Sequence, residues 1–414
     1  MMELLSPAGG MEQLRAAARF GADAVYGGLK KFGLRAAAGN FDWDELQTAL
    51  DLLHGQGKKF YLTLNILPYD DELAELGQSA RRAAQMGVDA AIDITGAEPA
   101  LNSALKCLRR EVPELALHVS TQANVMNAEA ANLFAQLGAE RIVLSRELSL
   151  ARIACLRERL DSRVELEAFV HGAMCMAHSG RCMMSDYLAG RGGNRGACAQ
   201  PCRWQYTVTE LKRPDEPMPV LEDERGTYIF SAYDLNMLSH LPEMRDAGIA
   251  SLKIEGRMKT AYYVASVTQV YRRALDLLAQ DEDTYRAALP ELQNELLKVS
   301  HRSSNTGFYF GAPQPASGAE GFSQTREFVG RVLGMRDGCM LAEVKNRFHV
   351  GDMIEALTPA GAKPFTVTEI RSAADGTRLD FVSVAGQQVL LPVDFIAEDG
   401  DYLRGPNRNH RMAQ

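Results

Sequence analysis

The stretch FGADAVY, residues 20–26, closes an amphipathic run and opens a β-rich one, and the same arrangement returns as MGVDAAI (86–92), LGAERIV (137–143) and AGIASLKI (247–254). In each stretch a glycine follows the amphipathic run, and strand-like residues begin within about two positions. Glycine adopts the left-handed conformation that ends many helices at little steric cost. The four stretches therefore predict helix-to-strand junctions in a chain that alternates helices with strands.

Eight β-rich runs precede roughly residue 280, more than a typical open doubly wound sheet contains. The expected strands are residues 3–6, 23–27, 59–65, 89–94, 115–120, 140–145, 163–169 and 249–255. The expected helices include residues 11–20, 43–54, 72–86, 99–110, 128–137, 150–160 and 262–278. Eight strand–helix units in a chain of this length favour a (β/α)8 barrel of the TIM type, which is an α/β fold.

The expected organisation has three parts. Residues 1–280 form the barrel, and an insertion at about residues 171–235 separates its seventh and eighth strands. Residues 281–324 form a helical connector that ends in a Pro/Gly/Ser-rich link. Residues 325–414 contain short alternating runs separated by Gly, Asp and Pro, followed by a basic tail. This last part predicts a small C-terminal antiparallel β-barrel domain.

Composition restricts the class of protein. The 414 residues are 46% hydrophobic and 24% charged, which is typical of a folded globular chain. The net charge of −8 argues against broad coating of nucleic acid or anionic membrane, although it is compatible with a local basic patch. The chain has no run of about 20 apolar residues and no signal-peptide pattern at its start. We therefore expect a cytoplasmic protein without a membrane partner.

Four of the seven cysteines gather in the insertion, as Cys175, Cys182, Cys198 and Cys202 in the pattern C-x6-C-x15-C-x3-C. In a reducing compartment such a group indicates metal binding rather than disulfides. Thiolates bind either zinc or an iron–sulfur cluster, and the lack of paired CxxC spacing modestly favours the cluster. Inert buried thiols are the alternative, but the surrounding sequence is polar and rich in glycine.

The seventh and eighth expected strands carry charged side chains on one face. In RVELEAFVHG, residues 163–172, strict alternation places aliphatic residues toward the helices and directs Glu167 and His171 toward the barrel interior and mouth. Lys253, Glu255 and Arg257 share one face of the eighth strand. Because an uncompensated buried charge is costly, we expect Glu167 to pair with Lys253, and Glu255 with Arg257 or another inward base. These five residues are the candidate catalytic group, and a purely structural ion-pair lattice is the alternative.

Further polar residues lie at expected strand ends, where barrel enzymes build their active sites. They are Tyr26, Gly27, Gly28, Arg35, Asn65, His118, Ser120, Gln122, Ser145, Arg146 and Glu147. The insertion also carries an excess of arginine, and we expect Arg191, Arg195 and Arg203 to contact RNA phosphate, with plain solvation as the alternative. The sequence contains no HExxH, GxSxG, GxxxxGK or CxxxCxxC motif.

These sequence features resemble the collagenase-like peptidases of family U32. The resemblance rests on ELLSPAG (3–9), GADAVYGG (21–28), EAFVHGAMCMAHSGRCMMS (167–185), GACAQPCRW (196–204) and SLKIEGRMKTAYYVA (251–265), and it extends over essentially the whole chain. Within the family, GTYIFSAYDL (226–235), HRSSNTGFYFG (301–311) and KNRFHVGDMIE (345–355) look most like the branch of transfer-RNA uridine hydroxylases.

The resemblance implies a 4Fe–4S cluster on Cys175, Cys182, Cys198 and Cys202. It also implies an enzyme that forms 5-hydroxyuridine at the wobble position of transfer RNA without oxygen, with prephenate, a small carboxylate co-substrate, as the hydroxyl donor. A collagenase-like protease, a hydroxylase of ribosomal RNA and a non-catalytic cluster protein are the alternatives. The sequence shows no recognisable nucleophile–base pair for proteolysis, and thiolates that hold a cluster cannot also attack amides.

Overall fold

Eight parallel strands close into a barrel, which confirms the predicted fold. The computed structural model describes residues 1–33, 38–66, 68–93, 99–174, 184–191, 197–201, 207–210, 213–219, 233–311 and 322–408. The barrel strands are β1 (Glu3–Pro7), β2 (Ala24–Gly28), β3 (Lys59–Leu64), β4 (Ala90–Asp93), β5 (Ala116–Val119), β6 (Arg141–Val143), β7 (Glu165–Ala173) and β11 (Ser251–Ile254). Strands β1 to β7 pair in chain order, and β11 pairs with both β1 and β7, which closes the sheet.

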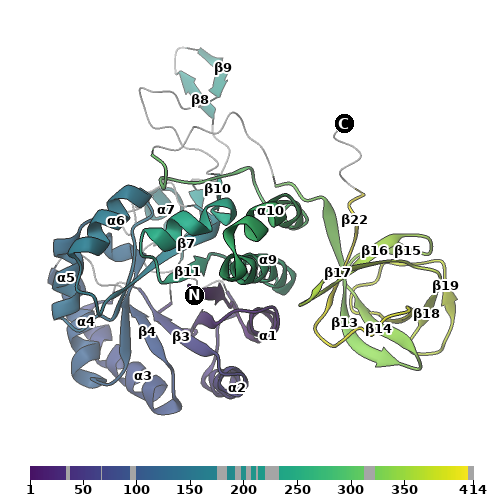
Figure 1. Cartoon of the computed structure of the whole chain (residues 1–414), viewed down its shortest axis with the longest axis horizontal. Helices are drawn as coiled ribbons and strands as arrows, with labels where there is room; N and C mark the ends of the chain where they lie inside the picture. Colours follow the sequence, from purple (N-terminus) through teal and green to yellow (C-terminus); the bar gives the residue numbers. More distant parts are fainter. Residues whose placement is uncertain are drawn as a thin grey trace.

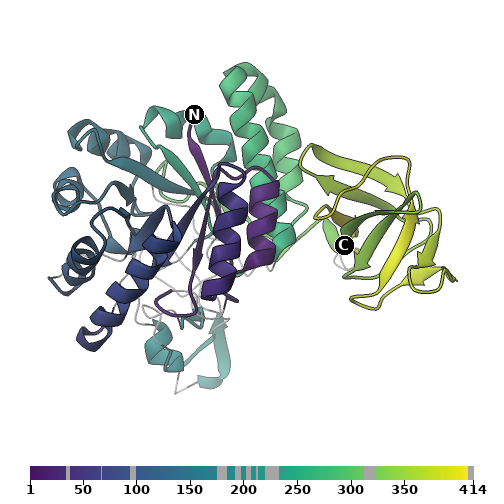
Figure 2. The ribbon, with the colours of Figure 1, turned by 90° about the horizontal axis from the view of Figure 1, so that it is seen from below.

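Helices surround the barrel strands (Figures 1 and 2). They are α1 (Met11–Arg19), α2 (Trp43–His54), α3 (Leu73–Met86), α4 (Pro99–Glu111), α5 (Ala128–Gln136), α6 (Leu150–Arg159), α8 (Leu241–Asp246) and α9 (Ala261–Gln280). Local sequence sets their starts: at α2, Asp42 accepts the Glu45 N–H at 2.9 Å, and Glu45 in turn accepts the Asp42 N–H at 3.0 Å. None of the described helices combines the length and hydrophobicity that a membrane span needs.

The four junction glycines take the left-handed conformation that the sequence predicts. Gly21, Gly87, Gly138 and Gly248 have φ angles of 101°, 94°, 91° and 80°. Gly87 is the C-cap of α3, where its N–H donates to the carbonyl of Ala84 at 3.0 Å. Because side chains with a Cβ rarely adopt these angles, glycine at these positions fixes where each helix stops and the next strand starts.

Regular pairing changes at the carboxyl end of β7. Strand β10 (Asp234–Asn236) runs antiparallel to residues 171–173, and β12 (Ser304–Asn305) pairs with β10, so the barrel sheet gains two strands here. Lys253 lies opposite Phe169, but the next residue, Ile254, lies opposite His171. The residue in between, Val170, is therefore extra and forms a β-bulge. Between β7 and β10 the structure describes α7 (Met184–Ala189) and a hairpin of β8 (Thr207–Glu210) and β9 (Arg213–Pro219).

Apolar side chains form separate cores inside and outside the barrel. The outer core lies between strands and helices and includes the fully buried Leu4, Leu166 and Val264. A smaller inner cluster contains Leu5, Ala24, Tyr26, Tyr61, Ala90 and Ile92. Alternation along each strand divides its residues between these two cores.

The C-terminal domain is an antiparallel sheet structure, as the sequence predicts. Its strands are β13 (Arg326–Arg336), β14 (Cys339–Val344), β15 (Phe348–His349), β16 (Met353–Thr358), β17 (Gly361–Thr366), β18 (Ile370–Ser372), β19 (Arg378–Leu379), β20 (Phe381–Val382), β21 (Gln388–Pro392) and β22 (Tyr402–Pro406). Eight of them pair in the order β17-β16-β22-β13-β14-β21-β18-β19, and β15 pairs with β20. The domain has its own core, which includes Val332, Met340 and Leu403.

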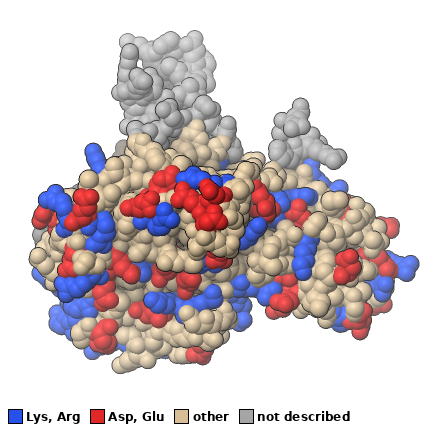
Figure 3. All heavy atoms as spheres, in the orientation of Figure 1, with Lys and Arg blue, Asp and Glu red and all other residues tan. Residues whose placement is uncertain are grey.

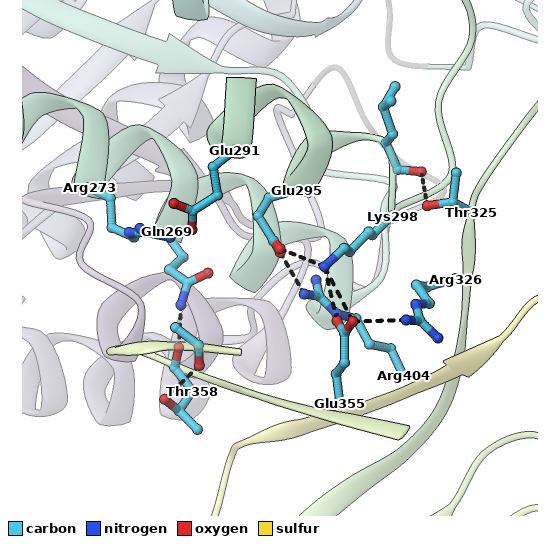
Figure 4. Close-up of polar contacts among 12 residues, drawn as sticks. Gln269, Arg273, Glu291, Glu295, Lys298, Thr325, Arg326, Glu355, Thr358 and Arg404 are labelled. Carbon is cyan, nitrogen blue, oxygen red and sulfur yellow. Dashed lines mark hydrogen bonds and ion pairs between the residues drawn. The ribbon is translucent and has the colours of Figure 1, made fainter. Parts of the chain in front are cut away.

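This domain packs on α9 and α10 (Glu282–Leu296) through a network of buried charges, which we call the interdomain ion network (Figure 4). Arg404 donates to Glu355 at 2.7 Å and to Glu295 at 2.5 Å. Lys298 lies 2.6 Å from Glu295 and 3.1 Å from Glu355, and Arg326 binds Glu355 at 3.0 Å. The end of α10 and three strands of the C-terminal domain, β13, β16 and β22, thus share one set of charges.

Aromatic contacts extend the same interface. Tyr262 of α9 stacks on Phe328 of β13 with ring centroids 5.1 Å apart and planes within 6°. Tyr402 packs against both Phe328 and Phe20. Tyr402 and Leu357 belong to the same buried apolar cluster as the outer core of the barrel. The two domains therefore share a continuous apolar core in addition to the ion network.

Candidate active site

The predicted cysteine ligands begin at the mouth of the barrel. β7 ends at Ala173, two residues before Cys175, on the face formed by the carboxyl ends of the parallel strands. Cys175, Cys182 and Cys202 lie outside the described residues, so their role as ligands stays a prediction. That position agrees with the expectation that the insertion leaves the catalytic face of the barrel.

Cys198 is the one predicted ligand in the described part of the chain. Its thiol is half-buried, and its Sγ accepts the Gln200 N–H at 3.3 Å. The adjoining Ala199 N–H donates to Ser185 Oγ of α7 at 2.9 Å, which holds this segment in place. Hydrogen bonds to ligand sulfurs tune iron–sulfur centres, so Cys198 fits the cluster that the family resemblance implies.

Of the three arginines expected to contact phosphate, the structure describes Arg191, which is exposed. The main-chain N–H of Arg191 donates to the carbonyl of Ser185 at 3.2 Å. Arg195 and Arg203 lie outside the described residues, as does Arg35 of the expected rim. The phosphate contacts stay a prediction.

Inside the barrel, Glu167 and Lys253 form the predicted ion pair at 2.7 Å, and both side chains are buried. Arg141 approaches Glu167 at 3.2 Å and Glu3 at 2.6 Å. Glu3 also accepts hydrogen bonds from Tyr61 at 2.7 Å and from Ser251 at 2.9 Å. We call Glu3, Arg141, Glu167 and Lys253 the inner ion network. Arg141 also binds the half-exposed Glu165 at 2.6 Å, so three carboxylates contact the two cations.

The inner ion network lies toward the amino ends of the strands, away from the mouth. Glu3 and Arg141 are the first residues of β1 and β6. Burial alone would raise the pKa of Glu3, but hydrogen bonding and charge from Arg141 outweigh that effect and lower it. Burial alone would lower the pKa of Arg141, but Glu167 and Glu3 raise it. The placement favours the structural alternative for Glu167 and Lys253, and their catalytic role stays a prediction.

His171 does not point into the barrel, and the expectation that it does is wrong. The β-bulge at Val170 places His171 opposite Ile254, on the outer side of the sheet. Its ring packs against Tyr271 and Tyr263 of α9, with centroids 5.6 and 6.3 Å away. Burial, followed by the charges of His301 and Lys259, lowers the pKa of His171 to about 3, so the ring is neutral at neutral pH.

Tyrosine hydroxyls compensate for the irregular strand ends. Two of them donate to main-chain carbonyls of β7: Tyr309 to Phe169 at 2.7 Å and Tyr271 to Val170 at 2.8 Å. Two others donate to carbonyls at the end of β11: Tyr26 to Ile254 at 2.8 Å and Tyr263 to Glu255, the next residue, at 3.4 Å. A buried carbonyl that loses its ladder partner needs another donor. The Val170 carbonyl also accepts the Met237 N–H at 2.9 Å, so the tyrosines and β10 together hold the bulged strand end that leads toward Cys175.

At the mouth, Glu255 pairs with Arg146 at 3.3 Å, which is the second of the two pairings expected for it. Arg146 follows β6, donates to the carbonyl of Ala173 at 3.0 Å, and lies with its guanidinium carbon 3.9 Å from the ring centroid of Phe169. Both side chains of the pair keep some exposure, at 13% for Arg146 and 16% for Glu255. This pair joins the carboxyl ends of β6, β7 and β11.

Arg257 occupies a cradle at the end of β2. It donates to Thr63 Oγ1 at 3.0 Å and to Asn40 Oδ1 at 2.5 Å, and it is 4% exposed. A Cβ on Gly28 would lie 2.5 Å from the Arg257 guanidinium, and one on Gly9 would lie 2.2 Å from the Arg257 carbonyl. Only glycine leaves room for this arginine, which explains part of the GADAVYGG motif.

Other expected rim residues take varied positions. Ser145 donates to Asn124 at 2.6 Å or to Glu147 at 2.8 Å, beyond the end of β6. His118 lies inside the barrel against Tyr61, with ring centroids 4.8 Å apart. Burial and the charge of Arg141 hold its pKa well below the usual value, so His118 is a neutral core residue.

Sequence patterns missed several residues that the structure brings to these sites. They are Glu3 and Arg141 of the inner ion network and Asn40 and Thr63 beside Arg257. Thr63 follows the alternation of its strand and could have been found from it, whereas Asn40 lies in a loop and gives no periodic signal. At the mouth, Arg146 and Arg257 are held by fixed partners, and anchored arginines of this kind suit the binding of carboxylate or phosphate groups.

Both the barrel part and the C-terminal domain match models of known protein families. Residues 9–318 match the model of peptidase family U32, and residues 324–404 match the model of the peptidase family U32 C-terminal domain. The tRNA hydroxylation protein P of Escherichia coli is 36% identical over 94% of this chain and 93% of its own length. A collagenase of Porphyromonas gingivalis is 32% identical over 94% of both chains. The 23S rRNA 5-hydroxycytidine synthase of Escherichia coli is 34% identical over 80% of this chain and 48% of its own length.

Proposed function

The chain belongs to peptidase family U32, and from that premise we propose that it is an RNA-modifying enzyme that hydroxylates a base of transfer RNA. The observation that carries the proposal is the similarity to tRNA hydroxylation protein P, which extends through both domains at 36% identity. We further propose that the product is 5-hydroxyuridine at the wobble position, that the reaction is independent of oxygen, and that prephenate is the hydroxyl donor.

The mouth of the barrel suits such a reaction. A base of an RNA loop must leave its stack and enter a pocket before an enzyme can modify it. Arg146 and Arg257 are held by fixed partners and can orient a carboxylate of the co-substrate or a phosphate of the RNA. Glu255, which pairs with Arg146, is the carboxylate that could accept or hold a proton beside them.

We propose that Cys175, Cys182, Cys198 and Cys202 hold a 4Fe–4S cluster at this mouth. The half-buried Cys198 thiol with its N–H donor supports this ligand assignment. A bound cluster would supply one-electron redox chemistry. The protein groups around it would bind and orient the substrates and exclude water.

RNA binding by this chain must be local, because the net charge is −8. On the face shown in Figure 3, basic and acidic side chains are interspersed, and no single basic patch covers it. Arg146 and Arg257 at the mouth, and the exposed Arg191 of the insertion, are the described arginines that we assign to phosphate contact.

A collagenase-like protease is the second candidate, because a collagenase is 32% identical over 94% of the chain. The sequence lacks HExxH and GxSxG motifs, and cysteines that hold a cluster are not available as nucleophiles. Ribosomal RNA as the substrate is a third candidate, but the similarity to the rRNA synthase covers only 48% of that protein.

Nucleoside mass spectrometry on a deletion strain tests the three candidates together. We expect 5-hydroxyuridine and its derivatives to disappear from transfer RNA and to return with the wild-type gene. A Cys182→Ala copy should not restore them, whereas Cys155→Ala should, because Cys155 is an exposed thiol outside the quartet. Unchanged transfer RNA together with loss of a hydroxylated ribosomal cytidine would shift the assignment to ribosomal RNA. Unchanged RNA and gelatin cleavage by the purified protein would favour the protease.

A further inference from the structure

Phe322 is an exposed aromatic residue between two cations. It is 56% exposed, although it precedes the first strand of the C-terminal domain by only a few residues. The Lys259 ammonium lies 4.9 Å from its ring centroid, and the Arg302 guanidinium carbon lies 4.3 Å from it. A large apolar ring that stays in water beside cations resembles the surfaces on which proteins stack nucleic-acid bases.

These three residues lie at the mouth of the barrel. Lys259 belongs to the loop between β11 and α9, two residues after Arg257, and its N–H donates to the carbonyl of Gly256. The Arg302 N–H donates to Asp234 Oδ2 of β10 at 3.1 Å. Asp234 lies opposite Ala173, the last residue of β7 before the cysteine segment. The ring therefore stands next to the proposed active site.

The backbone around Phe322 is fixed before any ligand binds. Ser323 exchanges two main-chain hydrogen bonds with His301, at 2.8 and 3.0 Å. The Thr325 N–H donates to the carbonyl of Leu297 at 2.9 Å. A stacking surface held in this way loses little conformational entropy on binding, which improves affinity.

We propose that Phe322, with Lys259 and Arg302, forms a stacking platform for an unpaired RNA base that neighbours the base being modified. The inference rests on the proposed function, and it adds a defined RNA contact outside the cysteine segment. Phe322 is 56% exposed, and every base has a face that can stack on an aromatic ring. The two cations would interact favourably with the adjoining phosphates. Of the acidic residues that the described structure brings to this part of the mouth, Asp234 is buried and Glu255 pairs with Arg146.

Binding of a fluorescein-labelled hairpin RNA that carries an anticodon loop tests the platform. Full-length protein, purified without oxygen, is compared with Phe322→Ala and Phe322→Tyr by fluorescence anisotropy. Loss of one base–aromatic stack weakens binding by about 5- to 150-fold, and we expect Phe322→Ala to fall in this range. Phe322→Tyr should stay within about threefold of wild type, because its ring still stacks.

The chain offers a matched control in Phe381 of β20. It is 44% exposed and lies 4.8 Å from the Arg347 guanidinium, but it belongs to the C-terminal domain. Phe381→Ala should leave hairpin binding unchanged. A paired duplex of the same stem provides a second control, because Phe322→Ala should not alter its affinity. Lys259→Gln should reduce the dependence of affinity on salt by roughly one phosphate contact, whereas Phe322→Ala should leave that dependence unchanged.

The outcomes separate this inference from the proposed function. If wild-type protein binds the hairpin and Phe322→Ala binds it equally well, the platform is wrong and the proposed function is unaffected. If wild-type protein does not bind the hairpin and the deletion strain keeps its hydroxylated transfer RNA, both are wrong. If Phe322→Ala weakens binding of a gelatin peptide while leaving RNA binding unchanged, the platform serves a protein substrate and the inference is overturned.

Discussion

Glu355 is the carboxylate on which the interdomain ion network depends. Arg404, Lys298 and Arg326 all lie within 3.1 Å of its oxygens, whereas Glu295 has contacts with Arg404 and Lys298 alone among these cations. The substitution Glu355→Gln keeps the size of the side chain and removes its charge. It therefore tests whether this network holds the two domains together.

The balance of charge predicts how much each substitution should destabilise the protein. The network has three cations and two carboxylates, so Glu355→Gln leaves three cations facing Glu295 alone. Arg404 has no exposed side-chain surface, and removing one partner of a buried pair typically costs about 3–5 kcal/mol. Arg404→Met instead leaves Glu295 and Glu355 with Lys298 and Arg326, so that the charges balance. We expect it to cost less, about 1–3 kcal/mol, for the lost charge-assisted hydrogen bonds.

Urea unfolding followed by two probes measures these costs. The two tryptophans, Trp43 and Trp204, both precede the C-terminal domain, so their fluorescence follows the barrel part, while far-UV circular dichroism follows both domains. We expect the two transitions to separate in Glu355→Gln, because the domains lose their coupling. Glu291→Gln is the matched control, since Glu291 of α10 pairs with Arg273 of α9 but is 63% exposed. It should cost under about 1 kcal/mol.

Two results would refute the reasoning. A cost for Glu355→Gln no greater than that for Glu291→Gln would show that the network does not hold the domains together. A greater cost for Arg404→Met than for Glu355→Gln would show that hydrogen bonds to Arg404, rather than the balance of charge, set the stability.

Three further predictions concern the barrel. The pKa of His171 is lowered to about 3, so between pH 6.5 and about 3 the unfolded chain binds a proton that the folded chain does not. Wild-type stability should therefore decrease as the pH is lowered through this range. His171→Phe should reduce the slope of stability against pH by up to ~1.4 kcal/mol per pH unit in urea titrations. Gly28→Ala places a methyl group 2.5 Å from the Arg257 guanidinium, and we expect hydroxylated transfer-RNA nucleoside to drop by more than about tenfold while circular dichroism stays native. Lys253→Met should destabilise the fold by about 3 kcal/mol, because it leaves the Glu167 carboxylate without this partner. If the pair is structural, adding Glu167→Gln should recover more than half of that loss, and no recovery would contradict a structural role.

The sequence predicted the features of the barrel that depend on local pattern. The junction glycines have positive φ, as expected from their place after amphipathic runs. Alternation along β7 correctly placed Glu167 inside the barrel, where it pairs with the inward Lys253 of β11. These features follow from a period of two along a strand and from the conformational freedom of glycine, and both can be read from a single sequence.

Prediction failed where neighbouring strands or distant segments decide the geometry. Alternation would also have turned His171 inward, but the β-bulge shifts the register and turns it toward α9. Nothing in the β7 sequence alone marks Val170 as the extra residue. The interdomain ion network joins Glu295 to Arg404, which are 109 residues apart in the chain, and such a contact has no periodic signal.

The β-bulge also separates the packed interior of the barrel from the mouth, where the candidate active site lies. Below it, the inner ion network links largely buried charges by short contacts, so it stabilises the barrel. Above it, regular pairing gives way: the Phe169 carbonyl accepts the Tyr309 hydroxyl, and the Val170 carbonyl accepts both the Tyr271 hydroxyl and the Met237 N–H. An irregular strand end is costly unless donors of this kind compensate for it. The four tyrosine hydrogen bonds at these strand ends help to fix the path of the chain toward Cys175. The ligands of a cluster would require such a fixed path.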